Sequence, residues 1–261
     1  MLKVAVVVPT VYSRPDYLAM SINSIQSQVG KFEMATVVVC PENKVSEVSA
    51  AMTGLLVLPE TRDGGLAHKL SQALMSAAQE SDYVAWLGDD DLLEPNAVES
   101  ALEKFSADPN IVMTFGGCHY IDSKGKRLGT NHSGQWAATF LRFGPQLIPQ
   151  PGSIMKSSAF LESGGLSDEF ALAFDFDLFL KLQKIGKLSH LGRAVASFRW
   201  HPDSLSVKRR MVSALEASRV RLSHYNKFVM LFSWIWEPVV ILSTWLAGKL
   251  VSLRARRQNA T

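Results

Sequence analysis

The sequence is poor in cysteine and in excess charge. Its two cysteines, Cys40 and Cys118, form neither a Cys-x-x-Cys motif nor a metal-type cluster with histidine, so we expect both to be reduced in a cytosolic environment. The formal net charge of +3 is too small to indicate nucleic acid by itself, and we expect no nucleic-acid partner. The chain also shows no internal repeat and no low-complexity tract.

The N-terminal apolar run is too short for the core of a signal peptide. It covers residues 4–8, ends at Pro9, and is typical of a first strand buried on both faces. No glycine-rich phosphate loop with a basic side chain follows this strand, which argues against a nucleotidyltransferase. A chain of 261 residues with 47% hydrophobic residues can form one large α/β domain, or one domain with an appendage.

Strand-like and helix-like segments alternate through the first hundred residues. Strands are expected at residues 4–8, 35–40, 55–58 and 83–87, and helices at 16–28 and 66–79. This alternation predicts βαβ units and a mainly parallel sheet. Ligands of such sheets bind beyond the carboxyl ends of the strands, so the loops after these strands should open at one edge.

The fourth strand ends in three consecutive carboxylates, Asp89, Asp90 and Asp91. They are followed by Pro95, which suits the first turn of a helix. Adjacent carboxylates repel one another, and a hard divalent cation can offset that repulsion by using carboxylate oxygens together with the phosphates of a ligand. The alternative is a solvated acidic turn that also caps the next helix.

The later part of the chain mixes strands, helices and one proline-containing loop. We expect helices at residues 96–105, 136–143, 158–163 and 176–184, and strands at 111–115, 117–121, 152–155 and 194–199. Pro145, Pro149 and Pro151 interrupt any regular structure, which predicts a long functional loop.

Several short motifs follow one another in a fixed order along the chain. In the first half they are Val8-Pro9-Thr10, Ser13-Arg14-Pro15-Asp16-Tyr17-Leu18, Ser24-Ile25-Gln26-Ser27-Gln28, Gly65-Leu66-Ala67 and Gly88-Asp89-Asp90-Asp91. In the second half they are Gly164-Gly165-Leu166-Ser167-Asp168-Glu169, Asp175-Phe176-Asp177-Leu178-Phe179-Leu180-Lys181 and His201-Pro202-Asp203-Ser204-Leu205-Ser206. The series resembles the inverting family 2 glycosyltransferases over roughly residues 4–207.

This resemblance implies an α/β protein with the GT-A fold. A mainly parallel nucleotide-binding sheet would be joined to a mixed sheet that shapes the acceptor side, all within residues 1–207. It further implies a nucleotide-diphosphate sugar donor, a divalent cation (Mg²⁺ or Mn²⁺), and a saccharide or lipid-linked acceptor.

The resemblance also assigns the donor-binding residues. The family's Asp-x-Asp motif falls on Gly88-Asp89-Asp90, so Asp90 would bind the metal, and Asp89 or Asp91 would contact the nucleotide in place of the acid that is missing at Gly88. The other residues expected around the nucleotide and its diphosphate are Pro9, Thr10, Arg14 and Glu42. Lys69 is a further candidate, although solvated surface charge is the simpler interpretation. His201 would approach the diphosphate or complete the metal shell; the alternative is a structural histidine.

Asp175 aligns with the catalytic base of the family. An inverting transfer needs one carboxylate that takes the acceptor's hydroxyl proton as its oxygen attacks. Between Phe174 and Phe176 this carboxylate would be partly desolvated, which raises its proton affinity. The alternative is that Asp175 caps a helix over residues 176–184.

Residues 208–261 form a separate basic and apolar appendage. Ten of the 27 lysines and arginines lie here, in and around a predicted basic amphipathic helix at 209–227 and on the far side of an apolar segment at 228–248. A simple span is disfavoured because Glu237 would lie near its centre, at a cost of about 2.5–3.5 kcal/mol, and because both flanks are basic. We expect a bent helical pair, hinged at Glu237-Pro238, that lies in the cytoplasmic leaflet. The alternative is packing on the protein's own core or on a partner.

Two hypotheses follow for function. The first is a metal-dependent inverting glycosyltransferase, peripheral or monotopic on the inner face of the cell membrane, that acts in surface polysaccharide or glycolipid synthesis. The second is a catalytically degenerate GT-A scaffold that serves as a membrane-bound binding module. Gly88, Pro41 and Phe174 motivate the second hypothesis, because each stands where the family usually has an acid.

Overall fold

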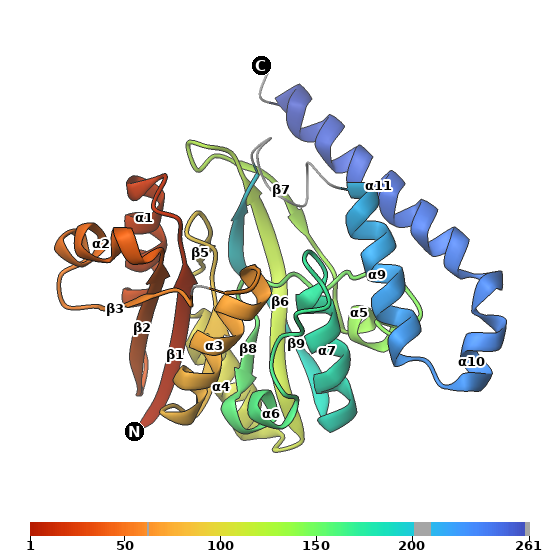
Figure 1. Ribbon diagram of the computed structural model, residues 1–261, viewed down its shortest axis with the longest axis horizontal. Coiled ribbons are helices and arrows are strands. Elements are labelled where there is room, and N and C mark those ends of the chain that lie inside the picture. Colours follow the sequence, from red (N-terminus) through yellow and green to blue (C-terminus); the bar gives the residue numbers. More distant parts are fainter. Residues whose placement is uncertain (62, 201–209, 259–261) are drawn as a thin grey trace.

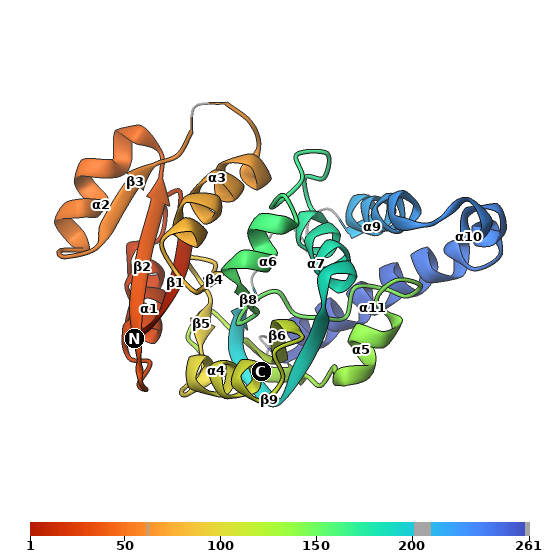
Figure 2. The same cartoon turned by 90° about the horizontal axis from the view of Figure 1, so that it is seen from below.

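A computed structural model describes residues 1–61, 63–200 and 210–258 of the chain. Within these ranges, nine strands form one curled mixed sheet in the order β3-β2-β1-β4-β8-β6-β9-β5, and β7 pairs with β6 (Figure 1). Helices cover both faces of the sheet, and a group of C-terminal helices lies at the end remote from β3 (Figure 2). The predicted combination of a parallel sheet with a mixed extension is confirmed.

The first half of the sheet is parallel. Its elements are β1 (Leu2–Pro9), α1 (Pro15–Gln26), β2 (Phe32–Cys40), η1 (Glu42–Lys44), α2 (Val45–Ala51), β3 (Leu56–Pro59), α3 (Leu66–Gln79) and β4 (Tyr83–Trp86). β1 pairs in parallel with β2 and β4, and β2 pairs in parallel with β3. Helix α2 was not predicted, because it buries only Val48 and leaves no apolar stripe in the sequence.

The second half is mixed. Its elements are β5 (Leu92–Leu93), α4 (Ala97–Ala107), β6 (Ile111–Ile121), β7 (Arg127–Asn131), α5 (Gln135–Phe140), β8 (Ile154–Lys156), α6 (Ser157–Glu162), α7 (Phe174–Ile185) and β9 (Lys187–Arg199). β8 is antiparallel to both of its neighbours, β4 and β6, whereas β6 and β9 are parallel.

Three boundaries in this half differ from the predicted ones. The predicted segments 111–115 and 117–121 form one strand, with Gly116 and Gly117 inside it. Glycine lets the neighbouring strands approach closely here: a Cβ atom on Gly116 would lie 2.6 Å from the Arg193 carbonyl oxygen, and one on Gly117 would lie 2.8 Å from the Asn131 carbonyl oxygen. β9 begins at Lys187 and not at residue 194. Its first seven residues were not predicted as strand because Leu188 and Leu191 stand apart among polar residues and glycine and form no continuous apolar run. Helix α7 begins at Phe174, which places Asp175 inside its first turn.

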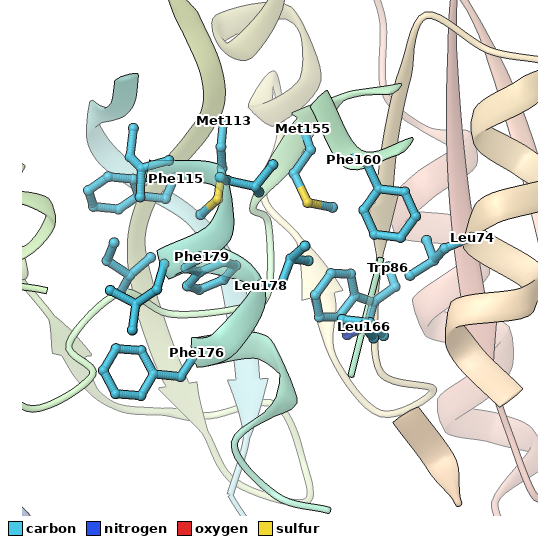
Figure 3. Close-up of a cluster of buried hydrophobic side chains, with 14 of the residues drawn as sticks. Leu74, Trp86, Met113, Phe115, Met155, Phe160, Leu166, Phe176, Leu178 and Phe179 are labelled. Carbon is cyan, nitrogen blue, oxygen red and sulfur yellow. The ribbon is translucent and has the colours of Figure 1, made fainter. Parts of the chain in front are cut away.

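The sheet separates two apolar cores. Along β1, Val4, Val6 and Val8 face the core under α1 and α4, whereas Val7 faces the core under α3, α6 and α7. In the second core, Phe176 and Phe179 of α7 pack near Met113 and Phe115 of β6, as Figure 3 shows. Helix α7, and therefore Asp175, is anchored by its own buried aromatic side chains.

The C-terminal helices are α9 (Arg210–His224), α10 (Lys227–Phe232), η2 (Ser233–Ile235) and α11 (Glu237–Gln258). α9 packs against both α7 and α11. In the described part of the chain, no individual helix has the length and apolarity to cross a membrane; the pair Lys227–Ile235 and Glu237–Leu246 reaches them together but is bent by 60°. The bent pair is confirmed, and the predicted boundary at residue 207 lies outside the described residues.

A buried ion pair joins α9 to α11. Two guanidinium nitrogens of Arg221, which is 1% exposed, donate to the Glu237 carboxylate at 2.8 and 2.6 Å. Ser218 and Tyr225 donate further hydrogen bonds to Glu237. Burial by itself would raise the pKa of Glu237, but these donors and the guanidinium charge hold the pKa below its ordinary value. Glu237, whose charge was expected to disfavour a membrane span, thus forms an ion pair inside the protein.

We predict that Arg221→Met lowers the free energy of unfolding by about 3–5 kcal/mol, because it leaves the Glu237 carboxylate buried without its counter-charge. The double variant Arg221→Met with Glu237→Met should recover most of that loss. Urea unfolding measures both effects, and Arg219→Met on the exposed side of α9 is the control. Equal stability of the Arg221→Met and Arg219→Met variants would contradict the structural importance of the pair.

Candidate functional site

A cleft of about 510 Å³ lies at the carboxyl ends of β1 and β4. One wall comes from the loops after β1, β3 and β4, and the opposite wall from the segment that leads into α7. The polar residues that line it are Thr10, Ser13, Arg14, Glu60, Lys69, Asp89, Asp90, Asp91, Gln150 and Ser213. The cleft opens at the sheet edge where the sequence predicts the ligand.

Asp89 is tied to the loop after β1. The Thr10 hydroxyl donates to Asp89 Oδ2 at 2.5 Å and accepts the Tyr12 N–H at 2.9 Å. Burial raises the pKa of Asp89, and the hydrogen bond from Thr10 opposes that shift. The two loops are therefore locked together at the mouth of the cleft, with a carboxylate at the junction.

Asp90 faces Arg14, which stands at the N-terminus of α1. The Arg14 Nη1 atom lies 3.7 Å from Asp90 Oδ2, and both side chains are partly exposed to the cleft. A guanidinium at a helix start, next to a carboxylate, suits a ligand that carries phosphate groups together with a cation.

Asp91 has a structural environment. Its side chain is 4% exposed and accepts the backbone N–H of Arg199 at 3.0 Å. The Arg199 side chain donates to the carbonyl oxygens of Asp90 and Asp122, and its guanidinium lies over the Tyr17 ring.

Burial, and then the charge of Asp90, raise the pKa of Asp91 well above its ordinary value. Of the two acids predicted to contact the nucleotide in place of residue 88, Asp89 is the better placed.

Gly88 lies close to the carboxylates of its two neighbours in the acidic loop. A Cβ atom at this position would lie 2.9 Å from Asp91 Oδ2 and 3.2 Å from Asp90 Oδ1. A side chain at residue 88 would therefore require the Asp91 carboxylate to move.

Asp175 follows Phe174, which lines the opposite wall of the cleft together with Leu172; Asp175 itself is not one of the lining residues. Its Oδ2 atom accepts the Gln146 side-chain amide at 2.7 Å, and its Oδ1 atom accepts the Phe176 N–H at 2.8 Å. Burial raises the pKa of Asp175, while these two hydrogen bonds oppose the shift. The carboxylate lies in the first turn of α7, whose cap is Ala173, so the alternative role of Asp175 as the cap of this helix was wrong. Its pKa is raised in the direction that suits a general base.

Most of the predicted site residues come together here. Pro9, Thr10, Arg14, Asp89, Asp90 and Asp91 all line the cleft. Lys69 lines it as well, where it pairs with Glu60 at 2.7 Å, and its contact with a diphosphate stays a prediction. Glu42 lies apart from this lining, on the exposed η1 turn after β2, and its predicted role stays a prediction. His201 lies outside the described residues.

Three functional candidates were missed from the sequence. Glu60 follows β3, so the rule that ligands lie at strand ends identifies it once that strand's end is known. Gln146 and Gln150 belong to the proline-containing loop, where only a functional loop was expected; Gln150 donates to the Trp86 carbonyl at 2.9 Å. No sequence pattern indicates which atom either glutamine contacts.

The carboxylate oxygens that line the cleft suit a hard divalent cation. No group of three histidine, cysteine, aspartate or glutamate side chains suited to a metal is present among the residues that the structure describes. Mg²⁺, however, is usually held by one or two carboxylates together with substrate phosphates and water. The Asp90 carboxylate, with Asp89 beside it, meets that requirement when the ligand supplies the remaining oxygens.

Comparison with known proteins connects this geometry to one family. The model of the family described as "Glycosyl transferase family 2" matches residues 5–162. A chondroitin synthase from Pasteurella multocida (strain Pm70) is 27% identical over 173 residues, which is 63% of this chain and 18% of the relative. A hyaluronan synthase from Pasteurella multocida is 27% identical over 148 residues, or 56% of this chain and 15% of that protein.

Solved structures show the same fold. The chain superimposes on S. aureus TarS (residues 1–349) in complex with UDP-GlcNAc with a TM-score of 0.58 and 16% identity, covering 87% of this chain and 73% of that one. The UDP complex of the same protein gives a TM-score of 0.57 and 17% identity, covering 87% and 72%. The chain spans less than a fifth of the length of the two synthases.

We predict that Gln146→Leu raises the pKa of Asp175 further, because it removes a hydrogen bond that favours the charged carboxylate. A carbon-13 NMR titration of the carboxyl groups, assigned with Asp175→Asn, measures the change. Gln150→Leu, in the same loop but bonded to Trp86, is the control and should leave this pKa in place. A fall in the pKa, or the same change in both variants, would contradict the assigned contact.

Proposed function

The chain belongs to glycosyltransferase family 2, and we propose that it transfers a sugar from a nucleotide-diphosphate donor to a saccharide or lipid-linked acceptor, with inversion at the transferred carbon. One observation carries this proposal. The cleft is lined on one side by Asp90 and on the other by Phe174, whose neighbour Asp175 is a carboxylate with a raised pKa. The polysaccharide synthases among its relatives support an acceptor in surface polysaccharide or glycolipid synthesis.

The donor would bind along the β1 and β4 edge. Asp89, fixed by Thr10, would contact the nucleotide, and Asp90 would hold a divalent cation on the diphosphate. Bound there, a Mg²⁺ or Mn²⁺ ion stabilises the negative charge that develops on the leaving diphosphate. Arg14 adds positive charge at the same place, and Lys69 lies within reach of the same cleft. The UDP-GlcNAc complex of TarS, a structural neighbour, makes UDP-GlcNAc the first donor to test.

The acceptor would enter from the α7 side. Asp175 would take the proton of its hydroxyl group as the oxygen attacks the sugar carbon, on the face opposite to the leaving diphosphate. Gln146 holds one carboxylate oxygen in place, and the apolar wall at Leu172 and Phe174 limits water around the reacting atoms. The retention of Asp90 in the cleft and of Asp175 in the first turn of α7 argues against the alternative of a degenerate binding scaffold.

We predict that Asp175→Asn lowers turnover about 10²- to 10⁴-fold, since general-base catalysis contributes that factor, while binding of UDP with Mn²⁺ is kept. Asp90→Asn should instead weaken the metal-dependent binding of UDP. A panel of nucleotide sugars with Mn²⁺ or Mg²⁺, scored for release of the nucleotide diphosphate, and thermal shift with UDP measure the two effects. Wild-type turnover should rise with pH through the raised pKa of Asp175 and then level off.

Asp108→Asn is the control for both variants, because Asp108 follows α4 and pairs with Lys187 outside the cleft. Full turnover in Asp175→Asn would remove the assignment of the base. If the wild-type chain releases nucleotide diphosphate from none of the donors, the alternative of a binding scaffold is favoured.

The C-terminal helices carry an extensive exposed apolar surface. We call this set the C-terminal apolar surface: Phe228, Met230, Leu231, Phe232, Trp234, Ile235, Val239, Leu242 and Leu246. Phe228 and Trp234 are 73% and 72% exposed, although such side chains are normally buried in a soluble domain. These residues lie on α10, η2 and the first half of α11, at the far end of the molecule from β3 (Figure 1).

This surface suits the interface of an anionic membrane. The bend between α10 and α11 would let both helices lie along the membrane plane rather than cross it. Glu237 at the bend points inward to Arg221, so its charge is kept away from lipid. Lys227 and Lys249, the latter over the Trp245 ring, would add attraction to anionic head groups. The proposed site of action is therefore the inner face of the cell membrane.

We predict that the double variant Leu231→Ser with Trp234→Ser reduces cosedimentation with phosphatidylglycerol-containing vesicles at least tenfold, because each change removes roughly 1.5–3 kcal/mol of apolar burial. Leu56→Ser is the matched control: Leu56 is 55% exposed but lies on β3. If the wild-type chain does not cosediment with the vesicles, elutes as a dimer in gel filtration, and becomes a monomer in the double variant, this surface is a protein interface.

A further inference from the structure

Glu216 of α9 binds three consecutive backbone amides of the segment that leads into α7. Its carboxylate accepts the N–H of Ala171 at 3.0 Å, of Leu172 at 2.5 Å and of Ala173 at 2.7 Å. Hydrogen bonds to an ionised acceptor are stronger than neutral ones, and here three of them converge on one buried side chain. A single residue thus fixes the path of the chain two residues before Asp175.

The segment held by Glu216 is itself part of the cleft. Ala171 and Leu172 line it, and so does Ser213, one turn before Glu216 on α9. Ala173 is the residue that caps α7, so its position sets where the first turn of that helix begins. Any displacement of this segment would move the cleft wall and Asp175 together.

Helix α9 is a firm support for this contact. At its C-terminal end, His224 contacts the buried Asp177 carboxylate of α7 at 2.7 Å, and Lys181 pairs with the other oxygen of Asp177 at 2.7 Å. On its other side, Arg221 binds Glu237 of α11. Helix α9 is therefore joined to the start of α7 at two points, through Glu216 before the helix and through His224 in its first turn.

We propose that Glu216 is a positioning residue for sugar transfer: by holding the amides of residues 171–173, it sets the place of Asp175 against the donor bound at Asp90. This inference rests on the proposed function. Glu216 belongs to the C-terminal helices, so these helices complete the acceptor side of the catalytic domain in addition to docking the chain at a membrane.

The charge of Glu216 has a second, electrostatic effect. Burial is the main reason that the pKa of Asp175 is raised, and the negative charge of Glu216 raises it further. The other charged groups close to this turn, Asp177, Lys181 and His224, are bound to one another. Removal of the Glu216 charge should therefore lower the pKa of Asp175, which a purely structural role would not predict.

The test is Glu216→Gln in the full chain, assayed for hydrolysis of UDP-GlcNAc with Mn²⁺ or, if another donor of the panel is faster, for that donor. We expect kcat to fall about tenfold to hundredfold, because a small misplacement of a reacting group costs that much. The KM for the donor should stay unchanged, the acid limb of the pH profile should move to lower pH, and hydrogen exchange at residues 171–173 should accelerate.

Two controls separate positioning from general loosening. Glu103→Gln removes an exposed carboxylate from α4, and Ser218→Ala removes a hydrogen bond between α9 and Glu237 without touching the 171–173 segment. Wild-type kcat in Glu216→Gln, or losses of kcat that simply follow the melting temperature in both α9 variants, would overturn the inference. If Glu216→Gln does not fold, Glu216→Asp replaces it in the test, because aspartate keeps the charge but has a shorter side chain. Its kcat and melting temperature are compared with those of Ser218→Ala in the same way.

Failure of the proposed function gives a different result. A wild-type chain that hydrolyses no donor, or an Asp175→Asn variant with full turnover, rejects the enzyme or its base. The hydrogen-exchange comparison still tests the contact of Glu216 in that case: unchanged protection at residues 171–173 in Glu216→Gln would reject it.

Discussion

Three adjacent carboxylates at the end of a buried strand are the constraint that organises this molecule. The fold gives each of them a different partner: Asp91 is buried against the Arg199 backbone, Asp89 is held by Thr10, and Asp90 faces Arg14 and the cleft. Because these partners come from β9, the β1 loop and the start of α1, separating the three charges also joins the two halves of the sheet. The ligand-binding edge is a consequence of that arrangement, since it turns Asp90 and the guanidinium of Arg14 toward the same cleft.

The parts of the fold that follow from local pattern were predictable from the sequence. β1 and β2 contain apolar runs rich in valine, β3 and β4 are shorter apolar runs, and α3 occupies the predicted range Leu66–Gln79. The rule for parallel sheets then places Thr10, Arg14 and Asp90 at one edge without knowledge of their contacts. β9 was predicted only in its last six residues, because its first half has no continuous apolar run, and β6 was divided in two at a glycine pair that close strand packing requires.

The remaining site residues depend on contacts between distant segments, which have no local signal. Gln146 and Asp175 are 29 positions apart, and Glu216 lies more than 40 positions from each amide that it binds. In the sequence Glu216 is one acid in a basic amphipathic helix, and a solvated position is the natural expectation. In the sequence, Arg221 belongs to a basic helix face and Glu237 is a single charge in an apolar segment. Only the structure shows that the two side chains pair with each other and are buried together.

Helix α9 lies between the cleft and the C-terminal apolar surface, so the two cannot be separated by cutting the chain. Truncation at Lys227 would remove the whole of α11, so α9 would lose both the Arg221–Glu237 ion pair and the helix that packs against it. The loosened α9 would also release the 171–173 segment from Glu216. Loss of activity in a truncated chain would therefore have two explanations, loss of the proposed membrane contact and displacement of the cleft wall at residues 171–173. Substitution of exposed residues such as Trp234, which take no part in these hydrogen bonds, isolates the first.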